Sequence, residues 1–216
     1  MARLLSIVIA TTNEGKLSEL RALLSDLPVQ LLSVADVLGA KLSIAEDGLT
    51  FDENASTKAR AVCQATNLYA LADDSGLEVD ALGGRPGVRS ARFAHERATD
   101  AENNAALLRE LDEVSDGGRT AKFRCVLALA SPWSVERVET VEGSCDGFIA
   151  RAPRGSGGFG YDPLFIVPEL GSRAMAELSE AEKNGVSHRA RAVRALRPVL
   201  LRLLDERLGE VERALG

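Results

Sequence analysis

Apolar residues recur along the chain with two different spacings, and each spacing predicts a kind of element. Residues 4–10 form a continuous apolar run of strand length, and residues 29–34 are interpreted as a second strand after Pro28. A third run, 69–72, ends at two acids, and residues 77–81 then alternate apolar and polar side chains as a half-buried strand does. Further strands are predicted over 121–131, 137–144 and 164–167, the first two as partners in a hairpin.

Helices are predicted where apolar residues recur every three to four positions, or where a capping sequence begins a segment. Residues 17–24 and 190–204 show the apolar spacing, and a short helix is expected over 35–38. Three capping boxes, in which Thr or Ser is followed three residues later by Glu, predict further helices. The pairs are Thr50 with Glu53, Thr99 with Glu102, and Ser179 with Glu182. At 216 residues, the chain is expected to form a single domain over 1–216.

Two adjacent carboxylates, Asp73 and Asp74, directly follow the third apolar run. Ser75 and Gly76 are ordinary turn formers, so the acids are predicted to lie where one strand ends and the next begins. Adjacent carboxylates repel each other and need a cation, a shared proton or free water. Two hypotheses stay open from these residues alone. One is a divalent metal site, for which oxygen ligands suit Mg²⁺; the other is a solvated acidic turn.

The polar loop between the first strand and the first helix, residues 11–16 (Thr-Thr-Asn-Glu-Gly-Lys), suits a phosphate. A helix N-terminus offers free N–H groups and the positive end of the helix dipole, and Lys16 adds a full charge. The loop is not a Walker A motif, because Ala10 and Leu17 stand where that motif has Gly and Ser or Thr. An ordinary capped helix start is the alternative interpretation.

Glycine becomes frequent from Gly143 onward, and we interpret residues 143–160 as one connected loop system. Its last part continues as Gly157-Gly158-Phe159-Gly160-Tyr161-Asp162-Pro163, which sets two aromatic residues among glycines in a chain with only 4% aromatic residues. Glycine allows the backbone to approach a flat ligand, and an aromatic face can stack on a base. The alternative is a hydrophobic plug on a glycine-rich turn.

Two groups of polar residues are further candidates for chemistry. Lys183, His188 and Arg189 are predicted to cluster at a break between two helices, where His188 suits a base, a metal ligand or a hydrogen-bond donor. Asn54 and Lys58 are four residues apart, so they share one face of a predicted helix. A solvated helix face is the simple interpretation of that second pair.

Composition and charge narrow the class of protein. A net charge of −6 and a pI of about 5.1 argue against a general electrostatic grip on nucleic acid, but not against a local basic pocket for a small anion. No apolar run approaches the ~20 residues of a membrane span, and the apolar start is interpreted as a strand rather than a signal peptide. Three cysteines without Cys-x-x-Cys spacing (Cys63, Cys125 and Cys145) predict buried thiols in a reducing, cytoplasmic setting.

Together, a lysine at a helix start, an acid pair, a glycine-aromatic loop and a Lys/His/Arg cluster indicate phosphoryl chemistry on a nucleotide. At this point the sequence resembles the inosine triphosphatase (Ham1-like) family of nucleoside triphosphate pyrophosphatases. The resemblance covers nearly the whole chain and depends on six motifs in the family's order. They are Thr12-Asn13-x-Gly-Lys16, Phe51-x-x-Asn54-Ala55-x-x-Lys58-Ala59, Ala72-Asp-Asp-Ser-Gly-Leu-x-Val-Asp80, Gly87-x-x-Ser-Ala-Arg92, Gly158-Phe-Gly-Tyr-Asp-Pro163 and Glu182-Lys-Asn-x-x-Ser-His-Arg189.

The resemblance implies a mixed α/β fold, in which a long twisted sheet and its helices form two lobes around a central nucleotide-binding cleft. It also implies a cytoplasmic homodimer that works with Mg²⁺, with Mn²⁺ as an alternative ion, and that has no nucleic-acid or membrane partner. The implied reaction is hydrolysis of purine nucleoside triphosphates with aberrant bases (ITP, dITP and XTP). Water attacks the α-phosphorus, and the products are the monophosphate and pyrophosphate.

The resemblance further implies roles for individual residues. Asp74 would be the general base and a metal ligand, with Asp73 and Glu46 as further ligands, although many relatives carry two glutamates where this chain has Ala45 and Glu46. A donor such as Arg189 would favour the carbonyl of hypoxanthine or xanthine over the amino group of adenine. The implied substrate-binding residues are Thr11, Thr12, Asn13, Glu14, Gly15, Lys16, Ser75, Phe159, Gly160, Tyr161, Asp162, Lys183, His188 and Arg189, with Lys58 as a helper.

Two alternatives stay open. One is a pyrophosphatase for modified pyrimidine nucleotides, of the kind found in the septum-formation-inhibitor (Maf) family. The Ser-His-Arg segment and the Asp-Asp-Ser-Gly sequence favour the inosine triphosphatase interpretation over it. The other is a nucleotide-binding sensor without catalysis, against which the paired acids and Lys16 count, because binding alone does not need them.

Overall fold

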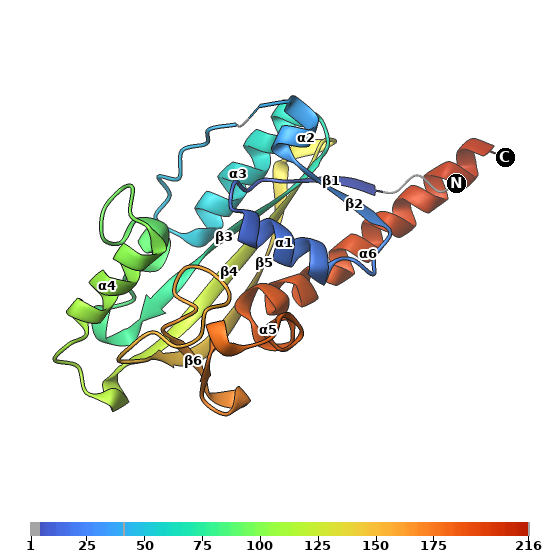
Figure 1. Cartoon of the computed structure of the whole chain (residues 1–216). Coiled ribbons are helices and arrows are strands. Elements are labelled where there is room, and N and C mark those ends of the chain that lie inside the picture. Colours follow the sequence, from blue (N-terminus) through green and yellow to red (C-terminus); the bar gives the residue numbers. More distant parts are fainter. Residues whose placement is uncertain (1–4, 41, 216) are drawn as a thin grey trace.

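The computed structural model describes residues 5–40 and 42–215, so Leu4 of the predicted first strand lies outside the described residues. The described residues form one seven-stranded sheet in the order β2-β1-β3-β4-β5-β6-β7 (Figure 1). β1 is parallel to both of its neighbours, and all pairs from β3 to β7 are antiparallel. The strands are β1 Leu5–Ile9, β2 Val29–Ser33, β3 Tyr69–Val79, β4 Thr120–Ser131, β5 Ser134–Ile149, β6 Phe165–Val167 and β7 Arg173–Ala174.

The helices begin close to where the sequence predicts them. All three predicted capping boxes form, with Thr50, Thr99 and Ser179 each accepting a hydrogen bond from the backbone of its Glu partner. Within the described residues, no helix combines the length and the apolar composition that crossing a membrane requires. The α-helices are α1 Glu14–Leu23, α2 Val34–Leu38, α3 Phe51–Thr66, α4 Asp100–Glu110, α5 Glu180–Val186 and α6 His188–Leu215.

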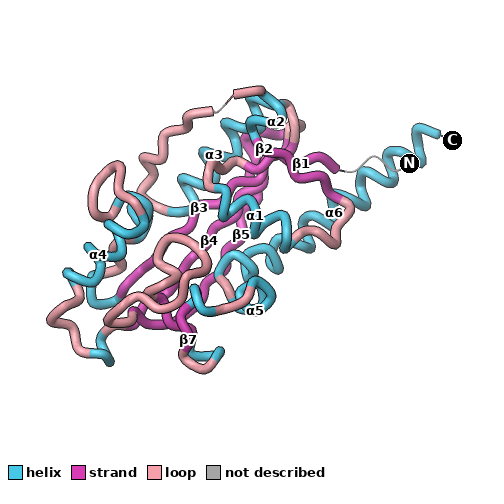
Figure 2. Tube along the Cα trace, in the orientation of Figure 1, coloured by secondary structure: helices cyan, strands magenta, loops and turns pink. Residues whose placement is uncertain are grey.

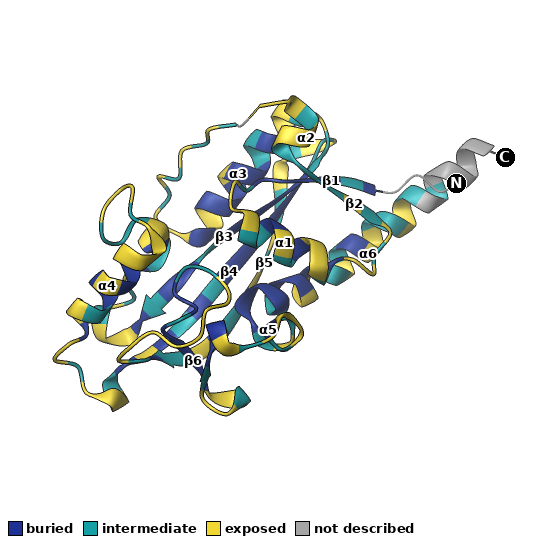
Figure 3. Cartoon of the chain, in the orientation of Figure 1, coloured by how far each residue is buried: buried dark blue, intermediate teal, exposed yellow. Residues whose placement is uncertain are grey.

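The helices cover both faces of the sheet, whose strands run side by side through the middle of the molecule (Figure 2). On the half of the sheet that contains β1, residues of α1 and α6 pack with one face and residues of α3 with the other. A third apolar cluster lies on the other half of the sheet, where residues of β3, β4, β5 and β6 pack with residues of α4. The buried residues lie along these strands (Figure 3). The predicted mixed α/β fold, a long sheet with helices, is therefore confirmed.

The prediction of a turn at Ser75 and Gly76 is wrong. β3 continues without a break from Tyr69 to Val79, because β4 pairs with it over Ala70–Val79. β1 pairs with β3 only as far as Leu71, so the following residues of β3 have an edge that β1 does not cover. A Cβ atom on Gly76 would collide with the side chain of Ser90 and the backbone of Gly87. This glycine allows close packing and does not mark a turn.

The interpretation of residues 143–160 as one loop system is also wrong in its first part. Gly143 and Gly147 lie inside β5, and only the later glycines lie in a loop. A Cβ on Gly143 would collide with the backbone of His188 and Ala192, in the first turns of α6. Glycine at this position thus lets the start of α6 lie directly against the sheet. This close approach of α6 brings Arg189 to Asp73, near the middle of β3.

Candidate functional site

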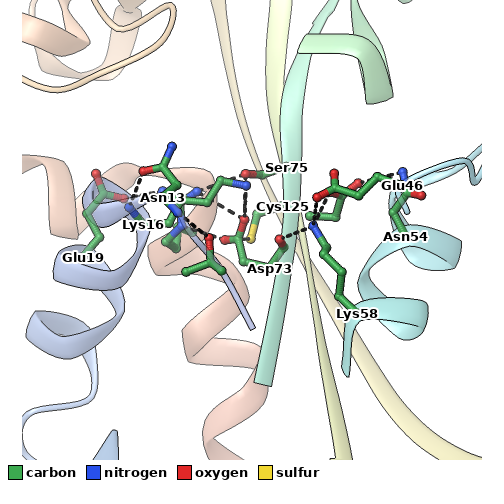
Figure 4. Close-up of polar contacts among 12 residues, drawn as sticks. Asn13, Lys16, Glu19, Glu46, Asn54, Lys58, Asp73, Ser75 and Cys125 are labelled. Carbon is green, nitrogen blue, oxygen red and sulfur yellow. Dashed lines mark hydrogen bonds and ion pairs between the residues drawn. The ribbon is translucent and has the colours of Figure 1, made fainter. Parts of the chain in front are cut away.

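Asp73 and Asp74 point to opposite faces of the sheet, because successive side chains of a strand alternate. Asp73 faces α1 and α6 (Figure 4). Asp74 faces α3, where it contacts Asn54 and Lys58. The two carboxylates therefore do not share one cation, as their adjacency in sequence suggested. Each has its own set of partners, and the uncovered edge of β3 lies between the two sets.

Asp73 is completely buried and is surrounded by donors. The ammonium of Lys16 lies 2.6 Å from its Oδ1, and the Arg189 Nε donates to its Oδ2 at 2.7 Å. The Ser75 hydroxyl donates to Oδ1 at 2.9 Å, and the Cys125 thiol lies 3.2 Å from Oδ2. Burial alone would raise the pKa of Asp73, but Arg189 and Lys16 hold that pKa well below its usual value. Asp73 is therefore a fixed anion that orients two cationic side chains.

Asp74 has fewer hydrogen-bonding partners than Asp73, and its pKa is shifted in the opposite direction. Lys58 donates to its Oδ1 at 2.7 Å, and the Asn54 amide donates to its Oδ2 at 3.3 Å. Burial raises the pKa of Asp74 above its usual value, against the opposing effect of Lys58. Asn54 and Lys58 are both buried, so the interpretation of their helix face as solvated is wrong. A carboxylate with a raised pKa beside its strongly anionic neighbour suits a general base.

Glu46 and Asp74 converge on one positive charge, which indicates how a metal ion would fit. The Lys58 ammonium lies 3.5 Å from Glu46 Oε1 and 2.7 Å from Asp74 Oδ1. Asn54 ties the two together, since its Oδ1 accepts a hydrogen bond from the Gly48 N–H beside Glu46. Among the residues that the structure describes, no three acid, histidine or cysteine side chains converge. Two carboxylates are nevertheless enough for Mg²⁺, which usually completes its coordination with water and substrate phosphates.

The loop 11–16 starts α1 at the point where β1 ends. Asn13 caps the helix, because its side chain accepts a hydrogen bond from the Lys16 N–H at 3.1 Å. Thr11 accepts one from the Asn13 N–H at 3.1 Å. The loop is therefore an ordinary capped helix start, as the alternative interpretation held. The same capped start also places the Lys16 side chain beside Asp73. The capped helix start and the phosphate site are compatible interpretations.

The glycine-aromatic loop lies directly against this helix start. A Cβ atom on Gly15 would lie 2.6 Å from the Phe159 ring, and the ammonium of Lys183 lies 4.8 Å from the centre of that ring. Asp162 holds the loop from within, because its Oδ2 accepts hydrogen bonds from the Phe159 N–H and the Lys183 ammonium. Tyr161 donates to the Ser90 carbonyl at 2.8 Å. Phe159 is therefore the one aromatic side chain of this loop that borders the site.

Glu19 is a site residue that the sequence analysis missed. Its carboxylate lies 2.6 Å from the Lys183 ammonium and also pairs with Arg189, so it joins α1 to the segment that starts α6. The available signal was its spacing, since Glu19 follows Lys16 by three residues and shares its helix face. Of the predicted cluster of Lys183, His188 and Arg189, the structure brings Lys183 and Arg189 together around this acid.

His188 belongs to the same segment as Arg189 and is buried. Its ring stacks on Phe123, with the ring centres 4.7 Å apart. Burial and the neighbouring Arg189 hold its pKa well below the usual value, so the imidazole is neutral. Its Nδ1 has no hydrogen-bond partner among the described residues. Of the three roles considered from sequence, a neutral hydrogen-bonding group fits this environment best.

All three cysteines are buried free thiols, as predicted. Cys125 differs from the other two because it contacts Asp73. Burial, and then the Asp73 charge, raise the pKa of this thiol well above its usual value. It therefore stays protonated and donates to the carboxylate.

A cavity of about 310 Å³ lies beside the site, between α1, the glycine-aromatic loop and α5. Gly15, Glu19, Phe159 and Lys183 line it, so it is the recess in which these residues can meet a ligand. A larger cavity of about 880 Å³ lies between the β4–β5 hairpin and α6, lined by residues such as Trp133 and Arg202. Its lining includes none of the predicted substrate-binding residues, so size alone does not identify the functional cavity.

These features define an α/β protein in which the capped start of α1, the two acids of β3 and a glycine-aromatic loop come together. The pattern of the Ham1 family matches residues 7–199, and the chain belongs to that family. The prediction made from the six motifs is thus confirmed.

Relatives of known sequence and structure are similar over most of their length. A dITP/XTP pyrophosphatase of Geobacillus kaustophilus is 54% identical over 88% of this chain and 91% of its own. One of Bacillus subtilis is 48% identical over 89% and 96%. The solved structure of a HAM1 protein from Coxiella burnetii is 43% identical, with a TM-score of 0.82 over 92% of this chain and 99% of that one.

Proposed function

We propose that this protein hydrolyses ITP, dITP and XTP to the corresponding monophosphate and pyrophosphate. The observation that carries the proposal is the division of labour between the two acids of β3. Asp73 holds Lys16 and Arg189, which are cations that can meet a triphosphate. Asp74 on the opposite face is oriented by Lys58 and Asn54 so that it can act as a base. The activity of the relatives, which are dITP/XTP pyrophosphatases, supports the bond cleaved and the class of base.

The proposed reaction begins with the triphosphate at the start of α1. The free N–H groups there and the Lys16 ammonium would bind phosphate oxygens, and Asp73 keeps Lys16 in place. Asp74 would take the proton of the attacking water as the water oxygen bonds to the α-phosphorus, and the bond from that phosphorus to the α–β bridging oxygen would break to release pyrophosphate. Lys58 would hold Asp74 in position and supply a further positive charge to the phosphates.

The base would lie in the recess beside Phe159. The Phe159 ring offers a stacking surface, and Lys183 and Arg189 lie on it as hydrogen-bond donors. Donors favour the carbonyl of hypoxanthine and xanthine over the amino group of adenine, because an adenine there would leave buried polar groups unpaired. The roles of Thr11, Thr12, Glu14, Ser75, Gly160, Tyr161, Asp162 and His188 as substrate contacts stay predictions.

We propose Mg²⁺ as the metal, with Mn²⁺ as an alternative ion, held by Asp74 and Glu46. The ion would neutralise phosphate charge and help to orient the triphosphate. Asp73 as a third ligand stays a prediction, and its present partners give it the separate task of orienting Lys16 and Arg189. The family resemblance also supports a single-domain chain that acts as a cytoplasmic homodimer without a nucleic-acid or membrane partner.

The test is a product assay with Mg²⁺ and, separately, ITP, dITP, XTP, GTP and ATP. Monophosphate and pyrophosphate should form from the first three, with GTP and ATP largely untouched and with no turnover in excess EDTA. Release of orthophosphate and a diphosphate would contradict attack at the α-phosphorus. Turnover of none of these nucleotides, or of modified pyrimidine nucleotides instead, would favour a sensor or a Maf-like enzyme.

A further inference from the structure

We call residues 157–160 of the glycine-aromatic loop the recognition loop. Its own sequence restrains its backbone conformation only weakly. Three of its four residues are glycines, and Gly158 and Gly160 have positive φ angles of 73° and 61°. Glycine loses more conformational freedom on folding than any other residue. A defined position for Phe159 therefore requires contacts from outside the loop.

Helix α4 supplies such contacts to both polar groups of Gly160. The Gly160 N–H donates to Asp100 Oδ2 at 2.7 Å, and the Asn104 amide donates to the Gly160 carbonyl at 2.9 Å. The two side chains are four residues apart, so they leave the helix on one face. Asp100 begins α4, and its bond to the N–H is charge-assisted and thus of the stronger kind. Together they fix Gly160, the residue that follows Phe159.

The environment of the Asn104 side chain indicates that its main role is the bond to Gly160. The side chain is 8% exposed, and the bond to Gly160 is its one hydrogen bond within residues 5–40 and 42–215. Its buried Oδ1 has no partner in that part of the chain. Turning the amide over would set this oxygen against the Gly160 carbonyl. Leaving the Oδ1 of a buried amide without a partner is unfavourable, so the bond from the amide nitrogen to the loop is the one polar interaction by which this side chain offsets its burial.

The loop also lacks packing on the side that faces α4. A cavity of about 440 Å³ lies there, lined by Ala101, Leu108 and Pro153 among others, and Phe159 borders it. Phe159 also borders the recess on the side of Lys183. The loop thus separates two open spaces. Asp162 holds the Phe159 N–H, and the two bonds from α4 hold the next residue, Gly160, so their loss gives this end of the loop room to shift.

We propose that Asp100 and Asn104 are positioning residues that set base discrimination through Gly160, although neither borders the recess beside the acids. The inference depends on the proposed function, in which Phe159 stacks on the base. Asn104→Ala should reduce the ratio of kcat/KM for ITP to kcat/KM for ATP by about fivefold, the effect of one lost neutral hydrogen bond, and Asp100→Ala, which loses a charge-assisted bond, by about tenfold or more. The KM for ITP should rise, and kcat should change little because the acids are untouched.

The matched control is Glu102→Ala, on the same helix. Glu102 closes the capping box with Thr99, so its loss loosens α4 without removing a bond to the loop. The conservative variant Asp100→Asn keeps an acceptor for the Gly160 N–H and should recover most of the discrimination. A Glu102→Ala protein that loses as much discrimination as Asn104→Ala would overturn the proposal, because general loosening of α4 would then explain both.

A second measurement does not depend on the reaction. Hydrogen exchange of the Gly160 amide should be faster in Asp100→Ala than in the wild type, and unchanged in Glu102→Ala. Wild-type protein that fails to hydrolyse ITP would contradict the proposed function, and the exchange data would still test the contacts from α4. Unchanged exchange in Asp100→Ala, or an unchanged ITP-to-ATP ratio in an active variant, would refute the positioning role.

Discussion

Replacing Asp74 by Asn removes one negative charge from the centre of β3 and preserves the volume of the side chain. The neighbouring acid offers a matched comparison, because Asp73→Asn makes the same chemical change one residue earlier, on the opposite face of the strand. The two variants should fail in different ways. Asp74→Asn should lose catalysis, and Asp73→Asn should lose stability.

The magnitudes follow from the partners that each variant leaves behind. In Asp74→Asn, the Lys58 ammonium keeps the Asp73 carbonyl at 2.9 Å and Glu46 at 3.5 Å, so we expect a loss of about 1–3 kcal/mol in the free energy of unfolding. Loss of a general base should lower kcat by about 10²–10⁴-fold. In Asp73→Asn, two cations lose their shared anion, and the Arg189 side chain is only 1% exposed. Breaking a buried pair of this kind costs about 3–5 kcal/mol.

The assay combines three measurements on each variant. Product-resolved hydrolysis of ITP gives kcat, urea unfolding gives stability, and binding of a non-hydrolysable ITP analogue shows whether the site is intact. Asp74→Asn should bind the analogue and unfold cooperatively while turning over slowly. Turnover within threefold of the wild type would remove Asp74 from its role as base. Equal destabilisation of the two variants would refute the different environments that we assign to the two acids.

Three further predictions test other parts of the structure. Lys16→Met should raise KM for ITP about tenfold or more, since a charged donor to phosphate is lost while Asp73 keeps Arg189, and an unchanged KM in steady-state kinetics would contradict the phosphate role. Gly143→Ala should lower stability to urea by about 1–3 kcal/mol because α6 must move off β5, whereas Gly117→Ala, with nothing within 4 Å of its Cβ, should be close to neutral. The Arg173 side chain, together with the cap at Ser179, lowers the pKa of Glu182 to about 2, so the stabilisation by Glu182 is complete above its ordinary pKa of 4.5 and is lost as the pH falls toward 2. The difference in urea midpoint between wild type and Glu182→Gln should shrink over that range, and a constant difference would show that charge is not the cause.

Local signals in the sequence predicted most of the elements. A capping box involves residues three apart, so Thr50, Thr99 and Ser179 identified three helix starts without any knowledge of the fold. The six motifs likewise predicted the family, which their order along the chain made specific. The cluster of Lys183 and Arg189 was predicted because both flank one break between helices.

The errors arose where distant segments decide the structure. Ser75 and Gly76 form a turn in many contexts, but here pairing with β4 keeps them in a strand. Gly143 was interpreted as loop because the helix that requires a glycine there begins 45 residues later, at His188. Glu19 was missed because its partners, Lys183 and Arg189, lie more than 160 residues further along the chain. Such contacts leave no periodic trace in one sequence.

Because side chains alternate along β3, this strand tolerates no insertion or deletion of a single residue before the two acids. One residue inserted or deleted within residues 70–72 would shift the register against β4, and would turn the first acid toward α3 and the second toward α1 and α6. Both carboxylates would still be present in the sequence, but each would occupy the environment suited to the other. Changes of length in this family should therefore accumulate in surface loops and be excluded from the strand that carries the two acids.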